Sequence, residues 1–256
     1  STPLYSSAAS DVYKRQSIDI IIPVYNEEHV LLDSIRQLHQ FLQENIQNPW
    51  RITIADNAST DATRSIAQLL SQDYPGVGYI FIPEKGRGRA LRASWLNSTA
   101  DFVSYMDVDL STDLNHLIEL ITALESGYHI AIGNRLNRKS QVTRGLKREV
   151  ISRCYNALIK SLFFTPFSDA QCGFKALNRR TAATIVPHIV NNNWFFDTEL
   201  LILAAKRGYK IKSIPVIWTD DPESSVNITD TAKEDLKGLF RLRFGRIPKI
   251  ASPVNE

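Results

Sequence analysis

The sequence predicts an α/β fold in which helices cover a mainly parallel central sheet. Short runs rich in β-branched residues alternate with longer segments whose apolar residues recur at helical spacing. The first run, residues 18–24 (IDIIIPV), is apolar throughout, which is typical of a strand with helices on both of its faces. Repeated alternation of this kind favours right-handed strand–helix–strand crossovers, and these build parallel sheets.

The strand and helix signals follow one another regularly through the first half of the chain. We expect strands at residues 18–24, 51–56, 78–83, 101–107 and 128–133. Helices are expected to begin near Asn26, Asp61, Gly86 and Leu114. Asn26 is the expected N-cap of the first helix, because an Asn side chain accepts hydrogen bonds from the free N–H groups of a helix start.

The second half is less regular, but it contains no internal repeat and no low-complexity linker. Near-alternating apolar residues predict a strand within 211–218. We therefore expect a single domain at residues 17–249 and a short tail at 250–256. Residues 1–16 lack the apolar centre of a signal peptide. They resemble the translated sequencing adaptors of metagenomic reading frames, and we expect a disordered, non-native leader.

Composition and charge limit the functions and locations that are expected for this protein. A net charge of +3 is too small to indicate nucleic-acid binding. The two cysteines, Cys154 and Cys172, have no paired spacing, which favours reduced thiols and a cytoplasmic location. No apolar run reaches the roughly 18 residues that indicate a transmembrane helix.

Polar residues follow four of the predicted strands, at the sheet edge where parallel sheets bind ligands. These stretches read YNEE, DNAST, EKGRGR and DVD. Asp56, at the end of the second strand, can accept hydrogen bonds from a base N–H or a sugar hydroxyl. The alternative is a turn or a helix cap that involves Ser59 or Asp61.

The stretch EKGRGR places several cations and two glycines at an expected helix start. Gly86 and Gly88 favour backbone that a phosphate group can approach closely. The alternative is a solvated cationic helix face, which is the usual role of a charge run. Neither a Walker pattern nor a dinucleotide-binding glycine pattern occurs.

Asp107 and Asp109 end the fourth strand as an Asp-Val-Asp sequence. The alternation of side chains in a strand points both carboxylates to one side. Two carboxylates with room for substrate phosphates suit Mg²⁺ or Mn²⁺. A capped turn before the helix at Leu114 is the alternative, and an isolated Asp-x-Asp does not decide between them.

Four of these stretches together, in this order and spacing, resemble the family 2 glycosyltransferases: IIPVYNEE, ADNASTDAT, EKGRGRALRASW and MDVDLS. The resemblance covers residues 17–245 and implies the A-type nucleotide-sugar-binding fold, which is Rossmann-like. The second half is similar to the polyprenyl-phosphate sugar synthases, and most similar to the dolichyl-phosphate glucose synthases, with the mannose synthases as near relatives. The stretches that carry this similarity are IGNR, DAQCGFKALNRRTA, WFFDTELL and IPVIWTDDPESS.

The resemblance implies a role for each matching position. Asp107 and Asp109 would hold the ribose and a Mg²⁺ or Mn²⁺ ion, with Asp109 as the stronger metal ligand. Arg135 and Arg148 would face the phosphates, and Arg148 matches the acceptor-phosphate arginine of the mannose synthases. The residues expected to bind the nucleotide are Pro23, Tyr25, Glu27, Asp56, Lys85 and Gly86. Those expected to shape the donor-sugar pocket are Gln171, Lys175, Asp197 and Glu199. The expected catalytic residues are Asp109, Arg135, Arg148 and Asp197.

Two positions depart from the family pattern. Ser111 stands where the mannose synthases offer a glutamine to the metal, and serine is a shorter and weaker ligand. Ser224 and Ser225 stand where a Ser-Lys pair is usual, so a lysine expected to contact a phosphate is replaced.

The resemblance implies transfer of a hexose from a nucleotide diphosphate sugar to a polyprenyl or dolichyl phosphate, with inversion at the anomeric carbon. UDP-glucose is the favoured donor, while GDP-mannose and UDP-N-acetylglucosamine stay open. A phosphate acceptor has a second pKa near about 6 and is largely a dianion at neutral pH, so it needs positioning more than a general base. Asp197 and Glu199 are therefore expected to orient other groups or to line the pocket, and neither is expected to be an obligatory general base.

A lipid acceptor implies contact with a membrane surface. Residues 230–246 combine apolar and basic side chains in an amphipathic helical pattern. Together with residues 158–164 they would lie on anionic lipid at the cytoplasmic face, as a peripheral contact. The alternative is a terminal helix whose apolar face packs on the core.

Two other functions stay open. A family 2 glycosyltransferase acting on a glycan or soluble hydroxyl would need a carboxylate base, and Asp197 is the best candidate. The other is an inactive nucleotide-sugar-binding module. Ser225 favours that second function, whereas the intact Asp56, Asp-Val-Asp sequence and Arg148 oppose it.

Overall fold

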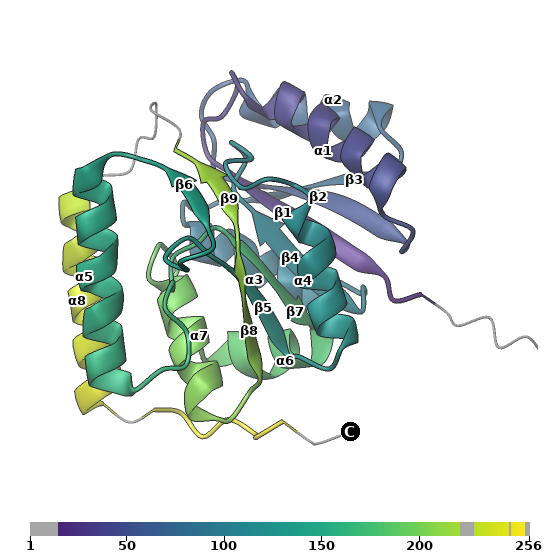
Figure 1. The fold of residues 1–256 in the computed structure, drawn as a ribbon. Coiled ribbons are helices and arrows are strands. Elements are labelled where there is room, and N and C mark those ends of the chain that lie inside the picture. Colours follow the sequence, from purple (N-terminus) through teal and green to yellow (C-terminus); the bar gives the residue numbers. More distant parts are fainter. Residues whose placement is uncertain (1–14, 221–227, 246, 254–256) are drawn as a thin grey trace, which may run out of the picture.

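The centre of the protein is a seven-stranded sheet (Figure 1). The computed structural model describes residues 15–220, 228–245 and 247–253. The strands of the sheet are β1 (Ile18–Val24), β2 (Trp50–Asn57), β3 (Val77–Ile82), β4 (Phe102–Met106), β5 (Ile130–Asn134), β7 (Phe174–Asn178) and β8 (Ile211–Pro215). Their order is β3-β2-β1-β4-β7-β5-β8, and β7 alone runs antiparallel to its neighbours in this sheet. A separate parallel pair consists of β6 (Gln141–Thr143) and β9 (Ile217–Thr219).

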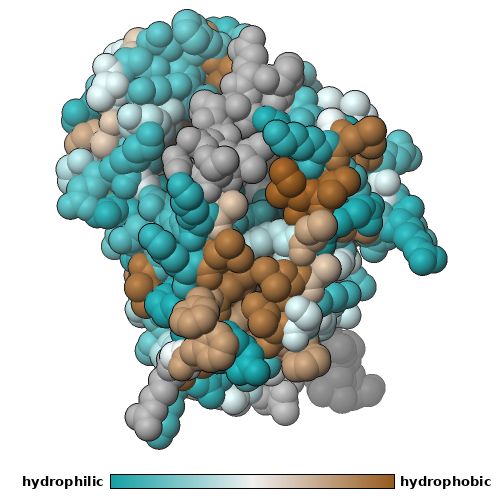
Figure 2. Space-filling view, turned by 90° about the vertical axis from the view of Figure 1, so that its left-hand side faces the viewer, coloured by the Kyte–Doolittle hydropathy of each residue, from teal (hydrophilic) through white to brown (hydrophobic). Residues whose placement is uncertain are grey.

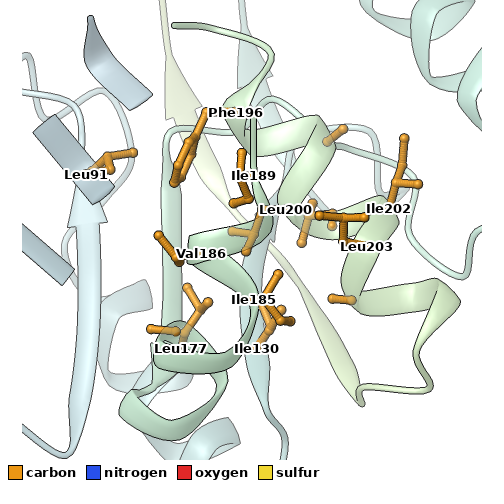
Figure 3. Close-up of a cluster of buried hydrophobic side chains, with 14 of the residues drawn as sticks. Leu91, Ile130, Leu177, Ile185, Val186, Ile189, Phe196, Leu200, Ile202 and Leu203 are labelled. Atoms are coloured by element: carbon orange, nitrogen blue, oxygen red, sulfur yellow. The ribbon is translucent and has the colours of Figure 1, made fainter. Parts of the chain in front are cut away.

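Helices cover both faces of the large sheet. They are α1 (Leu31–Asn45), α2 (Thr63–Asp73), α3 (Arg87–Asn97), α4 (His116–Glu125), α5 (Leu146–Phe163), α6 (Arg179–Ile185), the short 3₁₀ helix η1 (Val186–His188), α7 (Phe196–Lys206) and α8 (Ile228–Phe244). Because strand side chains alternate between faces, Ile20 belongs to a first buried cluster with residues of α1, α2 and α4, whereas Ile21 belongs to a second cluster with residues of α3, α6 and α7. Figure 3 shows part of the second cluster, where Leu177 and Ile130 lie among Ile185 and Leu200.

The structure confirms the predicted α/β fold, and the predicted strands are present with small shifts at their ends. The segment 211–218 divides into β8 and β9 at Val216. The sequence pattern does not predict β7, which carries the FKALN stretch between β4 and β5. This strand matters for the site, because it brings the QCGFK loop beside the end of β4.

The predicted N-cap at Asn26 is wrong. Helix α1 begins at Leu31, and Val30 occupies the N-cap position without a side-chain hydrogen bond. Asn26 instead adopts a left-handed backbone conformation with φ of 56°, which Asn tolerates better than most residues. Its Oδ1 accepts a hydrogen bond from the Thr60 amide at 2.8 Å, so Asn26 joins the loops after β1 and β2.

The predicted amphipathic helix is α8, which ends at Phe244. None of the helices in the described part of the chain has the length and apolarity needed to cross a bilayer. Two sequence-based expectations, for residues 1–14 and for Ser224 and Ser225, lie outside the described residues.

Candidate active site

The loops after β1, β2 and β4 meet at one edge of the sheet, because these strands are adjacent and parallel. Asp56 lies near the end of β2 and is fully buried. Its Oδ1 accepts a hydrogen bond from the Ser59 amide at 2.9 Å, and its Oδ2 accepts one from the Tyr79 hydroxyl at 3.3 Å. Asp56 therefore takes part in the turn with Ser59 that was the alternative expected from the sequence. Its contact with a nucleotide base stays a prediction.

The other residues expected around the nucleotide lie at the same edge. Pro23 is within β1. The Lys85 ammonium lies 3.6 Å from the centre of the Tyr25 ring, which is the distance of a cation–π contact. The Glu27 amide donates to Thr63 Oγ1 at 2.7 Å. The structure thus brings the first and third loops together through Tyr25 and Lys85.

The glycines of EKGRGR pack closely against another segment of the chain. A Cβ on Gly86 would lie 2.6 Å from the Asn192 carbonyl oxygen, and one on Gly88 would lie 2.6 Å from Cβ of Phe196. The amide of Gly86 donates to Asn57 Oδ1 at 3.0 Å. Glycine is needed because another segment of backbone lies against the start of α3, while a nucleotide contact of Gly86 stays a prediction.

The Asp-Val-Asp sequence follows β4, which ends at Met106, and its first carboxylate, Asp107, lies against the QCGFK loop. The Asp107 amide donates to the Gly173 carbonyl oxygen at 3.2 Å. A Cβ on Gly173 would lie only 1.7 Å from Asp107 Oδ2, so no other residue fits there without displacing the carboxylate. Asp109 is exposed, and its Oδ1 accepts from the Ser111 amide at 3.0 Å. A cavity of about 10 Å³, enough for one water-sized sphere, is lined by Asp107, Asp109, Ser111 and Gly173 among others.

The residues around this cavity fit a Mg²⁺ or Mn²⁺ ion in part. Asp107 and Asp109 supply oxygen atoms only, which are the donors that these hard cations prefer. In the described ranges no group of three or more His, Cys, Asp or Glu side chains could hold a metal. The protein therefore offers an incomplete set of ligands, which substrate phosphates and water would complete.

Arg87 links the Asp-Val-Asp sequence to the buried part of the site. Its Nη2 donates to Asp107 Oδ1 and to the Tyr105 hydroxyl, each at 3.0 Å, and its Nη1 donates to Asp197 Oδ2 at 2.6 Å. Burial opposes the charge of Arg87, but Asp107, Tyr105 and Asp197 outweigh it and raise its pKa well above the usual value. The sequence did not single out Arg87, because two similar arginines follow it in the same run.

Asp197 and Lys175 form an ion pair inside the protein. The Lys175 ammonium is 3.2 Å from Asp197 Oδ1, and both side chains are at most 1% exposed. The Tyr105 hydroxyl donates to the same oxygen at 2.6 Å. Burial raises the pKa of Asp197, but Lys175 and Arg87 overcome this and leave it below its usual value. Asp197 is therefore an ionised anchor that receives hydrogen bonds from its neighbours.

The two arginines expected to face phosphates each pair with a carboxylate. Arg135 Nε and Nη2 donate to the two Asp169 oxygens at 2.8 and 2.9 Å. Burial opposes the Arg135 charge, but Asp169 outweighs it and raises the pKa of Arg135. Arg148 Nη1 donates to Asp220 Oδ1 at 2.5 Å and stays one-third exposed. Of the two, Arg148 is the more accessible to a ligand.

Gln171 and Glu199, expected in the donor-sugar pocket, contact α8 and its surroundings. Gln171 Nε2 donates to Asp235 Oδ2 at 2.8 Å. Glu199 is buried and accepts from the amides of Val190 and Asn191 at 3.1 and 3.0 Å. The Arg241 guanidinium also lies 2.8 Å from Glu199, so this carboxylate ties α7 to α8.

A larger cavity of about 580 Å³ lies on the other side of Asp109, between the start of α1 and β9. Its lining includes Gln37, Asp109, Ser111 and Asp220. The volume lies within the range of roughly 300–1,000 Å³ that is usual for small-molecule sites. Arg148 lies next to this wall through its pair with Asp220.

The sequence profile described as glycosyl transferase family 2 matches residues 19–185, from β1 to the end of α6. The chain belongs to this family. The matched segment contains Asp56, both Asp-Val-Asp carboxylates, and Arg87 and Gly173, which contact Asp107.

Curated relatives of this family 2 member are glycosyltransferases. The glycosyltransferase AglD of Haloferax volcanii is 30% identical over 82% of this chain, and the chain spans 34% of that protein's length. Dolichyl-phosphate β-glucosyltransferases of Saccharomyces cerevisiae and Dictyostelium discoideum are each 26% identical, over 88% and 89% of this chain and 74% of their own lengths. These relatives confirm the resemblance to the polyprenyl-phosphate glucose synthases.

Solved structures confirm the A-type fold. Glucosyl-3-phosphoglycerate synthase from Mycobacterium tuberculosis, in complex with Mn²⁺, UDP and glucosyl-3-phosphoglycerate, has a TM-score of 0.67 at 17% identity, over 91% of this chain and 81% of that chain. Its complex with UDP alone has a TM-score of 0.66 over 88% of this chain and 79% of that chain. At this identity the similarity establishes the fold.

Replacing Gly173 by Ala tests the contact between the two loops. The added Cβ must displace the Asp107 carboxylate, and we expect a loss of about 1–3 kcal/mol in the free energy of unfolding, as for other overpacked sites. Urea unfolding measures this loss. Gly145→Ala is the matched control, because nothing lies within 4 Å of a Cβ at that position. Equal stability of the two variants would contradict the contact.

Asp235 predicts a pH dependence of stability. Burial raises the pKa of Asp235 to about 7, with contributions from Glu234 and Asp197, against the opposing hydrogen bonds of Gln171 and Tyr155. Between its usual value of 3.8 and about 7, the folded state holds a proton that the unfolded state has lost. Stability from this group is therefore present at low pH and falls as pH rises through that window.

The variant Asp235→Asn cannot ionise, so it should lack this fall. Urea unfolding of both proteins at the two ends of the window measures the difference. We expect the variant to gain stability relative to the natural protein as the pH rises from the lower end to the upper end. A stability difference that is the same at both ends would show that Asp235 titrates normally.

Proposed function

We propose that this protein transfers a hexose, glucose being favoured, from a nucleotide diphosphate sugar to a polyprenyl or dolichyl phosphate at the cytoplasmic face of a membrane. UDP-glucose is the favoured donor and GDP-mannose the alternative. The proposal is supported by the dolichyl-phosphate β-glucosyltransferases among the relatives. The structural neighbour that binds UDP and Mn²⁺ supports a uridine nucleotide and a divalent ion.

The observation that carries the choice of acceptor is the environment of Asp197. A hydroxyl acceptor needs a general base within reach of the attacking oxygen. Asp197 is 1% exposed and holds Arg87, Lys175 and Tyr105, so it is not available for that role. A phosphate monoester is largely a dianion near neutral pH and attacks without such a base. The site therefore favours a phosphate acceptor over a glycan or soluble hydroxyl.

The chain's own residues would hold the donor at the sheet edge. Asp107 and Asp109 would hold Mg²⁺ or Mn²⁺, whose charge would stabilise the leaving diphosphate when bound. Arg87 orients Asp107 through its hydrogen bond of 3.0 Å. Tyr25 and Lys85, which contact each other at the same edge, would lie beside the nucleotide.

Arg148 is the residue best placed to hold an acceptor phosphate. It is one-third exposed and lies next to the cavity of about 580 Å³ that reaches Asp109. A phosphate would replace Asp220 as the partner of Arg148, because a guanidinium binds phosphate with two parallel hydrogen bonds. Arg135 would add positive potential from its place beside Trp218, whose ring centre is 5.4 Å away.

The surface of α5 and α8 supports a lipid partner. Figure 2 shows hydrophobic side chains gathered on the face that these two helices form. We call Leu236, Phe240 and Phe244 of α8 the apolar ridge; they are 55%, 66% and 70% exposed and recur every four residues. Exposed Lys237 and Arg243 flank the ridge, so it would combine apolar insertion with attraction to anionic lipid.

Replacing Arg148 by Ala tests the proposed acceptor site. We expect turnover of polyprenyl phosphate to fall roughly 10- to 150-fold, which corresponds to the loss of a charge-assisted hydrogen bond of about 1.5–3 kcal/mol. Formation of glycosylated polyprenyl phosphate from labelled UDP-glucose, and in parallel from GDP-mannose, measures this.

The control is Arg51→Ala, an exposed arginine at the start of β2, on the opposite edge of the sheet. It should leave turnover unchanged. Unaltered turnover in Arg148→Ala would overturn the role of this residue. Failure of the natural protein to glycosylate polyprenyl phosphate from either donor would contradict the proposed function.

A further inference from the structure

Helix α8 has two different faces. Its outer face carries the apolar ridge of Leu236, Phe240 and Phe244. Its inner face packs so tightly on the start of α7 that a Cβ on Gly238 would lie 2.3 Å from the Phe195 ring. A helix seated this closely transmits any displacement of its outer face to its inner contacts.

Two neighbouring acids on α8 hold the loops of the candidate active site. Glu234 Oε1 accepts from the side-chain amides of Asn191 and Asn193 at 2.6 and 3.1 Å. Asp235 Oδ2 accepts from Gln171 Nε2 at 2.8 Å. One turn of helix therefore holds both the turn before α7 and the QCGFK loop.

The turn held by Glu234 lies against the start of α3. The Asn192 carbonyl oxygen accepts from the Arg89 amide at 3.0 Å and would lie 2.6 Å from a Cβ on Gly86. Arg92 reaches the same turn through the carbonyl oxygen of Ile189 at 2.6 Å. The start of α3 carries Arg87, so the position of this turn helps to fix the guanidinium that orients Asp107.

The loop held by Asp235 lies on the other side of Asp107. Gln171 is two residues before Gly173, whose backbone contacts Asp107 directly. Helix α8 therefore constrains Asp107 from both sides, by way of Arg87 and by way of Gly173. Helix α8 can therefore affect binding of the donor without touching it.

We propose that Glu234 and Asp235 are positioning residues of the donor site, through which the seating of α8 on a lipid surface strengthens binding of the nucleotide. The proposal rests on the proposed function for its lipid surface and its nucleotide. A helix fixed on a membrane restricts the motion of the loops it holds, so those loops lose less conformational entropy when the nucleotide binds. By reciprocity, the bound nucleotide strengthens attachment to the membrane by the same factor.

The experiment titrates UDP with Mn²⁺ into the full chain, with and without vesicles of phosphatidylglycerol and phosphatidylcholine that contain no polyprenyl phosphate. We expect vesicles to lower the Kd for UDP about fivefold or more, the lower end of typical coupling between sites. In the double variant Glu234→Ala/Asp235→Ala this effect should vanish, while sedimentation with vesicles is kept. In turnover assays the loss should raise the KM for the donor and leave kcat unchanged.

Two controls separate positioning from simple destabilisation. The amide variant Glu234→Gln/Asp235→Asn keeps an acceptor oxygen at each position, so the vesicle effect should return. Glu44→Ala removes an exposed acid of α1 that accepts a hydrogen bond from Gln40 of the same helix, and this variant should behave as the natural protein does. The ridge variant Phe240→Ser/Phe244→Ser should lose both vesicle binding and the change in Kd.

The outcomes are distinguishable. If the natural protein binds vesicles and UDP but its Kd does not change, the coupling is overturned and the proposed function stands. A vesicle effect of full size in Glu234→Ala/Asp235→Ala would overturn the role of the two acids. If neither UDP nor, in a parallel titration, GDP binds with Mn²⁺ under either condition, the proposal and the proposed function both fail.

Discussion

The charge balance around Arg87 is the constraint on which the geometry of the site depends. Its guanidinium lies between Asp107 of the Asp-Val-Asp sequence and the buried Asp197, at 3.0 and 2.6 Å. Removing one partner of a buried ion pair typically costs about 3–5 kcal/mol, because the remaining charge stays without compensation. Asp107 is thus fixed by protein contacts, whereas Asp109 reaches toward solvent and both cavities.

The same network is the reason for proposing a phosphate as the acceptor. Lys175 and Tyr105 complete the contacts of Asp197, and together they turn a carboxylate that resembles a general base into a structural anion. Arg148, which pairs with Asp220 in the wall of the larger cavity, would suit an acceptor that already carries negative charge. Helix α8 connects this network to the surface. The loops on both sides of Asp107 are hydrogen-bonded to α8, and the outer face of α8 carries the apolar ridge.

Sequence patterns predict the parts of this site that lie at strand ends. The periodicity of β1, β2 and β4 places Asp56, Asp107 and Asp109 at one edge, because the topology of parallel sheets is regular. The patterns do not reveal β7, which is short and inserted antiparallel between β4 and β5. They also do not reveal the Asn26 conformation, because asparagine suits both a helix cap and a left-handed loop.

The long-range contacts are not readable from the sequence for a physical reason. Arg87 and Asp197 are 110 residues apart, and Gln171 and Asp235 are 64 apart. Nothing local distinguishes Arg87 from the other arginines of its run; only the fold selects the one that points between two acids. The need for glycine at position 173 likewise becomes visible only once the fold places the Asp107 carboxylate beside it.

Electron paramagnetic resonance of Mn²⁺ in the presence of UDP tests the central claim most directly, because it detects whether the Asp-Val-Asp carboxylates and the nucleotide bind one ion. The account predicts that the free Mn²⁺ signal decreases when UDP is added to the natural protein, relative to UDP alone. It predicts that Asp109→Asn abolishes most of this decrease, while the fold is preserved. Equal Mn²⁺ binding by the natural protein and Asp109→Asn would contradict the assignment of this edge as the nucleotide-sugar site.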